Sequence, residues 1–182
     1  MKTRLRFGFV PVLLLLLAAS AAAQAADSVR VQVNWAPNDQ LSEVRQNSMH
    51  RGYMQPAQWQ KSLGDYLRQR AARLLSAGQR LDVTIDDIKL AGDFEPWRGP
   101  AMQDVRIMKD IYPPRIDLHF RLTDASGATL REGSAKLRDL AYLQHALPND
   151  SDPLRYDKRM LGDWLRAEFR RGGGHASNQR GA

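Results

Sequence analysis

The 182-residue chain contains no cysteine. It therefore has no disulfide bond, no thiolate ligand for a metal, no thiol nucleophile and no thiol for lipid attachment. Its four histidines, His50, His119, His145 and His175, are far apart and show no metal-ligand spacing. No glycine-rich phosphate loop precedes a helix. We therefore expect no cofactor and no metal, and we assign no catalytic residues.

Long apolar runs are absent except near the N-terminus. Lys2, Arg4 and Arg6 precede an apolar stretch, and small residues then lead to Ala23-Gln24-Ala25. This order is typical of a cleaved Sec-type signal peptide, which we predict over residues 1–25. The alternative is a retained anchor, but the run is shorter than the ~20 residues that a membrane span needs. We expect a periplasmic protein with no transmembrane anchor after cleavage.

The excess of positive charge is modest. The whole chain has a net charge of +7, and removal of residues 1–25 would lower it to +4. A secreted chain with so small an excess does not favour nucleic acid as a partner. The length suits one domain, which we place at residues 26–170. The glycine-rich residues 171–182 are predicted to be a disordered C-terminal tail.

The hydrophobic pattern predicts an α+β fold. Alternating residues indicate strands at 28–35 and 80–90, and a hairpin formed by 115–124 and 128–140. The alternation slips at Asp87, which indicates a β-bulge. Val105, Ile107 and Ile111 suggest another short strand.

Helical spacing predicts helices over 56–76 and from Asp152-Pro153 onward, and Leu41 to Arg45 suggests one helical turn. The simplest arrangement has two layers, with two helices packed on one face of a mostly antiparallel sheet. The other face of the sheet would then be partly hydrated.

Four stretches carry a family resemblance. They read DDIKLAG at 86–92, FEPWRGP at 94–100, KDIYPPRI at 109–116, and SDPLRY at 151–156 followed by Asp163-Trp164-Leu165. With these motifs in order, residues 29–169 resemble a secreted proteobacterial family known only as domain of unknown function 3016. The resemblance implies an envelope protein with a signal peptide. It transfers no catalytic residue, cofactor or substrate.

The segment from Asp93 to Arg115 is the best candidate for a binding site. Its prolines and glycines restrict its shape, while its cations suit carboxylate or phosphate and its aromatic residues suit flat apolar contacts. The candidate residues are Glu95, Trp97, Arg98, Arg106, Lys109, Asp110, Tyr112 and Arg115. The alternative is structural, because Glu95, Asp104 and Asp110 nearly match the cations in number and Trp97 would then fill the core.

These patterns favour a non-enzymatic binding or envelope-accessory module, whose partner would be an envelope protein or an anionic envelope component. One alternative is a periplasmic hydrolase with His119 as general base beside an acidic residue, although the pattern favours a solvated histidine on the sheet face. A third hypothesis places the last helix on anionic lipid or lipopolysaccharide. That helix carries Arg155, Lys158, Arg159, Arg166, Arg170 and Arg171, which also suit a solvated face. The sequence does not determine the oligomeric state.

Overall fold

The computed structural model describes residues 30–47, 54–145 and 150–172. The predicted signal peptide at 1–25 and the part of the predicted tail from residue 173 onward lie outside these residues. Within the described ranges, no helix is both long and apolar enough to cross a membrane.

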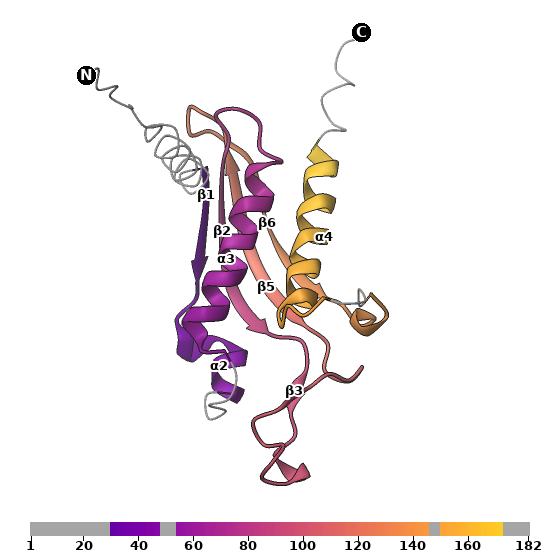
Figure 1. Cartoon of the computed structure of the whole chain (residues 1–182). Helices are drawn as coiled ribbons and strands as arrows, with labels where there is room; N and C mark the ends of the chain where they lie inside the picture. The colour runs from indigo at the N-terminus through magenta and orange to yellow at the C-terminus, as the bar shows by residue number, and fades with distance from the viewer. Residues whose placement is uncertain (1–29, 48–53, 146–149, 173–182) are drawn as a thin grey trace, which may run out of the picture.

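One layer is a four-stranded sheet in the order β1–β2–β5–β6 (Figure 1). The strands are β1 (Val31–Trp35), β2 (Arg80–Lys89), β5 (Arg115–Thr123) and β6 (Thr129–Arg138). β1 pairs in parallel with β2, whereas β2–β5 and β5–β6 are antiparallel. The expected α+β fold with a mostly antiparallel sheet is confirmed. The parallel pair requires a crossover connection, which a helix provides.

The second layer consists of α3 (Pro56–Ala72) and α4 (Arg155–Gly172), which cover the same face of the sheet, as predicted (Figure 1). The short α2 (Ser42–Asn47) and a 3-10 turn, η1 (Asn38–Gln40), precede α3. Apolar residues from both helices and the inner sheet face form one core, which includes Trp59, Leu63, Leu67, Val83, Leu118, Leu161 and Leu165.

The opposite face of the sheet is polar, as expected. Arg121 donates a hydrogen bond to Glu132 at 3.2 Å, and Arg138 donates one to Asp117 at 2.7 Å. The register shift between Ile85 and Asp87 confirms the predicted bulge. The extra residue allows Ile85 and Ile88 both to face the core although they are three positions apart.

Both helices differ slightly from the predicted bounds. α3 ends at Ala72, four residues early, and Leu74 is partly exposed instead of belonging to the buried stripe. Gly78, with φ of 80°, lies so close to the hairpin turn that a Cβ there would be 2.9 Å from the Ala125 Cβ. Glycine at this position, between α3 and β2, permits the close approach. α4 continues through Gly172, so residues 171 and 172 belong to the helix.

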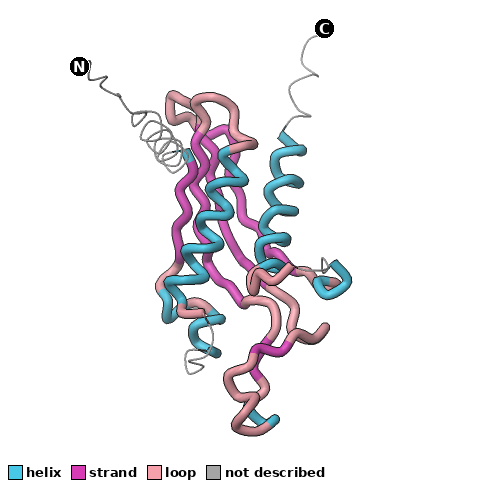
Figure 2. The backbone as a smooth tube through the Cα atoms, viewed as in Figure 1, coloured by secondary structure: helices cyan, strands magenta, loops and turns pink. Residues whose placement is uncertain are grey.

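A segment between β2 and β5 projects from one end of the sheet (Figure 2). We call residues 93–115 the projecting loop. It contains β3 (Asp93–Phe94), the 3-10 turn η2 (Pro96–Arg98) and β4 (Arg106–Ile107), and β3 pairs antiparallel with β4. The predicted short strand is thus present, but it contains neither Val105 nor Ile111. A further 3-10 turn, η3 (Tyr142–His145), follows β6.

The contact between α3 and α4 gives a test of the helix packing. A Cβ at Gly162 would lie 2.5 Å from the Tyr66 hydroxyl oxygen. Overpacking costs ~1–3 kcal/mol, whereas alanine favours a helix over glycine by ~1 kcal/mol. We expect Gly162→Ala to lower the free energy of unfolding, and to raise it by up to ~1 kcal/mol in a Tyr66→Phe background. Urea unfolding of wild type, the two single variants and the double variant measures the change in stability that Gly162→Ala causes in each background. A change of the same sign in both backgrounds would contradict this packing.

Candidate functional site

Arg106 fastens the projecting loop to the body of the protein. Its two terminal nitrogens donate to the two carboxylate oxygens of Glu43, at 2.6 and 3.0 Å. It also donates to the backbone carbonyls of Leu90, Ala91 and Gly92 at 2.7–3.0 Å. The side chain is only 2% exposed. Arg106 therefore faces the interior, and the structure removes it from the surface that a ligand could contact.

Glu43 connects this arginine to α2 and to the end of β2. It accepts a hydrogen bond from the backbone N–H of Leu90 at 3.0 Å and one from the Asn47 amide at 2.9 Å. Burial alone would raise the pKa of Glu43, but the hydrogen bond and charge of Arg106 outweigh it, so the pKa lies below its usual value. The buried Lys89 ammonium lies 3.0 Å from Asp93 and 3.7 Å from Glu43. These charges form one buried network.

Asp157 holds the same part of the chain from α4. Its Oδ1 accepts a hydrogen bond from the Ala91 N–H at 3.2 Å, while Oδ2 is buried without a hydrogen-bond partner among the described residues. Burial raises the pKa of Asp157 to about 7, although the nearby charge of Arg106 opposes this. Residues 90–92, from which the loop departs, are thus held by Glu43, Arg106 and Asp157.

A second buried carboxylate, Glu95, organises the loop itself. It accepts hydrogen bonds from Lys109 at 2.5 Å and from the Tyr112 hydroxyl at 2.9 Å, and it pairs with Arg98. The hydrogen bond from Lys109 is the largest cause that lowers the pKa of Glu95, which is about 2. The predicted residues Glu95, Arg98, Lys109 and Tyr112 do come together, but they bind one another. These contacts give the loop a fixed interior.

The remaining predicted residues of the loop face outward. Trp97 is 72% exposed, so it does not fill the core, and Ile111 in the same loop is 71% exposed. Asp110 and Arg115 are also exposed, and neither side chain makes a hydrogen bond or ion pair with the rest of the described chain. A cavity of about 280 Å³ lies beside the loop, and Lys89, Asp93, Ile111, Tyr112 and Arg115 contribute to its walls. The loop therefore has a fixed interior and an unusual apolar surface.

His119 lies elsewhere, on the polar face of the sheet. Its Nδ1 is 2.8 and 3.0 Å from the two carboxylate oxygens of Asp86 on β2, whereas Asp117 on its own strand pairs with Arg138. Ser134 is its cross-strand neighbour on β6. Both His119 and Asp86 are about half exposed. Among the described residues, no group of three or more His, Asp or Glu side chains is placed to hold a metal ion.

Sequence analysis did not identify Glu43, Lys89 or Asp157. Glu43 and Arg106 are 63 positions apart, and Asp157 is 66 positions from Ala91, so no local spacing relates them. The sequence does show charged residues next to short apolar segments, but this pattern does not reveal which charged residues pair with one another.

The buried carboxyl of Asp157 predicts a specific pH dependence of stability. Its pKa is about 7 in the folded protein against a usual 3.8, so between these values the folded state holds a proton that the unfolded chain has lost. Stability from this group is complete below pH ~4 and is lost as the pH rises to ~7, by up to ~4 kcal/mol. Asp157→Asn removes the titration. We expect the stability of this variant relative to wild type to increase between pH 4 and 7 in urea unfolding, and a constant difference would contradict the assignment.

Comparison with known families gives one match. The sequence profile of a family described as "Protein of unknown function (DUF3016)" matches residues 29–167. This range includes the four-stranded sheet, the projecting loop and most of α4. No curated protein matches the chain. Because the match extends over most of the chain, the resemblance found from the four motifs is confirmed, and the protein belongs to the DUF3016 family.

Proposed function

We propose that the protein is a non-enzymatic binding module of the bacterial envelope, and that it contacts a partner protein through the projecting loop. The observation that carries this proposal is the exposure of Trp97 on a loop whose interior is fixed by Glu95. A tryptophan in full contact with water gains free energy when a partner covers it, and tryptophan is enriched among the residues that dominate binding energy. Because the loop is already ordered, binding costs little conformational entropy.

Other exposed groups of the projecting loop suggest the chemistry of the partner surface. Ile111 provides a second exposed apolar side chain, and Arg115 is an exposed cation without a carboxylate partner in the described chain. Arg98 keeps 46% of its side chain exposed while it pairs with Glu95. An apolar pocket with an acidic rim would complement these groups. With the predicted signal peptide, this partner would be an envelope protein.

The test compares substitutions of two exposed apolar side chains, Trp97 on the projecting loop and Leu130 near the hairpin turn at the other end of the sheet. Wild type, Trp97→Ala and Leu130→Ala proteins serve as bait in envelope extract, with quantitative mass spectrometry as readout. We expect a protein captured by wild type and Leu130→Ala and reduced about tenfold or more by Trp97→Ala, since removal of a dominant interface residue costs at least ~2 kcal/mol. Purified partner and protein would then confirm the difference by calorimetry.

Leu130 is the matched control because it is 51% exposed and lies near the hairpin turn, far along β6 from the loop. Thermal unfolding should be the same for all three proteins, because neither side chain belongs to the core. If no captured protein distinguishes Trp97→Ala from wild type, the loop is not the binding surface. Equal loss with Leu130→Ala would also contradict the proposal.

A second candidate function is the hydrolase with His119 as general base. The observation in its favour is the contact between His119 and Asp86, which could orient the imidazole next to Ser134. Against it, both side chains are about half exposed, so water would compete for every polar contact that the reaction needs. No hydrogen bond joins His119 to Ser134 among the described residues. The binding module is therefore the better-supported function.

We expect the purified protein to hydrolyse p-nitrophenyl esters at the rate of buffer alone, with His119→Gln giving the same rate. The physical reason is the absence, among the described residues, of a nucleophile hydrogen-bonded to His119. A wild-type rate above background that falls in both His119→Gln and Ser134→Ala would contradict this expectation and favour the hydrolase.

A further inference from the structure

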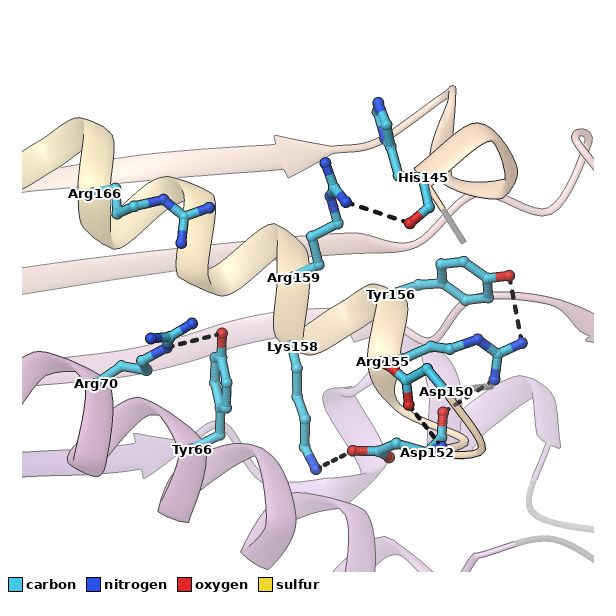
Figure 3. Close-up of a pocket in the computed structure, with 10 residues that line it drawn as sticks. All are labelled: Tyr66, Arg70, His145, Asp150, Asp152, Arg155, Tyr156, Lys158, Arg159 and Arg166. Carbon is cyan, nitrogen blue, oxygen red and sulfur yellow. Dashed lines mark hydrogen bonds and ion pairs between the residues drawn. The ribbon is translucent and has the colours of Figure 1, made fainter. Parts of the chain in front are cut away.

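A groove of about 540 Å³ lies between α3 and α4 and shares no residue with the projecting loop (Figure 3). Figure 3 shows that its side chains come from both helices, from η3 and from the segment that leads into α4. Two carboxylates, Asp150 and Asp152, line it together with a larger set of cations, which are Arg70, Arg155, Lys158, Arg159 and Arg166. The groove is therefore strongly basic.

Two of these cations, Arg70 and Arg155, form no ion pair with a carboxylate in the described chain. Lys158 pairs with Asp152 at 2.6 Å. Arg155 instead donates to the backbone carbonyl of Asp152 at 3.0 Å and lies over the Tyr156 ring, 4.4 Å from its centroid. Arg70 donates only to the Tyr66 hydroxyl, at 3.4 Å. The hydrogen bonds of Arg70 and Arg155 that the structure describes thus go to neutral groups, although the charge of Arg155 also acts on Asp152.

The other two arginines share one carboxylate. Arg166 pairs with Asp163, and the Nε of Arg159 lies 3.7 Å from the same carboxylate. Arg159 also donates to the backbone carbonyl of His145 at 3.3 Å. Even with Asp163 counted, the positive groups outnumber the negative ones by two. A ligand with two negative charges would therefore balance the groove.

The shape of the groove is held by the contact that brings α3 and α4 together. Gly162 permits the Tyr66 hydroxyl to approach the backbone of α4, where a Cβ would be only 2.5 Å away. This contact fixes the spacing between Arg70 on one helix and Arg166 on the other. A binding site needs such fixed spacing, because donors that are already in place lose little entropy when a ligand binds.

We infer that this groove binds a phosphate group carried by a small molecule or a lipid. A phosphate dianion has the charge that the groove requires, and its oxygens accept the paired N–H donors of arginine. Tyr66 can add a hydroxyl donor, because its proton has no acceptor among the described residues. The volume lies within the range of ordinary small-molecule sites.

The test is titration of the purified protein with pyrophosphate and inorganic phosphate, followed by calorimetry and by amide chemical shifts. We expect saturable binding with shifts confined to the two groove helices. Arg70→Gln/Arg166→Gln should weaken it about tenfold or more, because two charge-assisted contacts are lost. Arg70→Lys keeps the positive charge but removes the paired N–H donors, so it should weaken binding less than the double variant does. Its effect measures how much the paired donors contribute beyond the charge.

The matched control is Arg121→Gln/Arg138→Gln, which removes the same charge from exposed arginines on the polar face of the sheet. It should change the affinity by no more than about twofold at ~0.1 M ionic strength, where distant charges are screened. Circular dichroism confirms that each variant is folded. Equal weakening by the control would overturn the proposal. So would the absence of binding at ~10 mM pyrophosphate, because a dissociation constant above that value is no tighter than a single weak anion contact gives.

Vesicles separate the two sources of phosphate. Flotation with phosphatidylcholine vesicles that contain phosphatidic acid, reduced by the groove variant and unaffected by the control, would assign a lipid headgroup. Pyrophosphate binding without flotation would assign a soluble phosphorylated ligand. Flotation that is equal for wild type and the groove variant, without pyrophosphate binding, would overturn the proposal. The outcome is independent of the projecting loop, because the two sites have no residue in common.

Discussion

The buried pair of Arg106 and Glu43 is the interaction on which the arrangement of the other segments depends. Two charges have been removed from water, and each offsets part of the cost of burying the other. Lys89 near Glu43, and the backbone carbonyls that Arg106 contacts, complete the network around the pair. The pair thus joins α2, the end of β2 and the projecting loop, although they are far apart in the sequence.

The periodic parts of the chain were predictable. Alternation of apolar residues correctly predicted β2, β5 and the bulge at Asp87, because one face of these strands is solvated and the other is buried in the core. Trp59, Leu63 and Leu67 likewise predicted α3. The end of α3 was not predicted, because Leu74 and Leu75 continue the helical spacing in the sequence although the helix ends at Ala72.

The proline- and glycine-rich composition of residues 93–115 indicated a loop, and the structure has a loop there with two short strands. The sequence left open whether Trp97 fills the core or lies on the surface, and whether Glu95 balances the cations of the loop. In the structure Trp97 is exposed, and Glu95 is buried where Arg98, Lys109 and Tyr112 contact it. The sequence predicted only part of the basic groove. It showed the cations of α4, but it did not indicate that Tyr66 and Arg70 on α3 lie next to them.

The separation of 63 positions between Glu43 and Arg106 also has a consequence for the order of folding. Contacts between distant residues form late, because the chain between them must first be ordered. The interval contains α3 and β2, whereas β1, β5 and β6 lie outside it. The ion pair therefore closes a loop of the chain through one helix and one central strand. A chain in which this pair has not formed lacks one of the contacts that hold the projecting loop to the body of the protein.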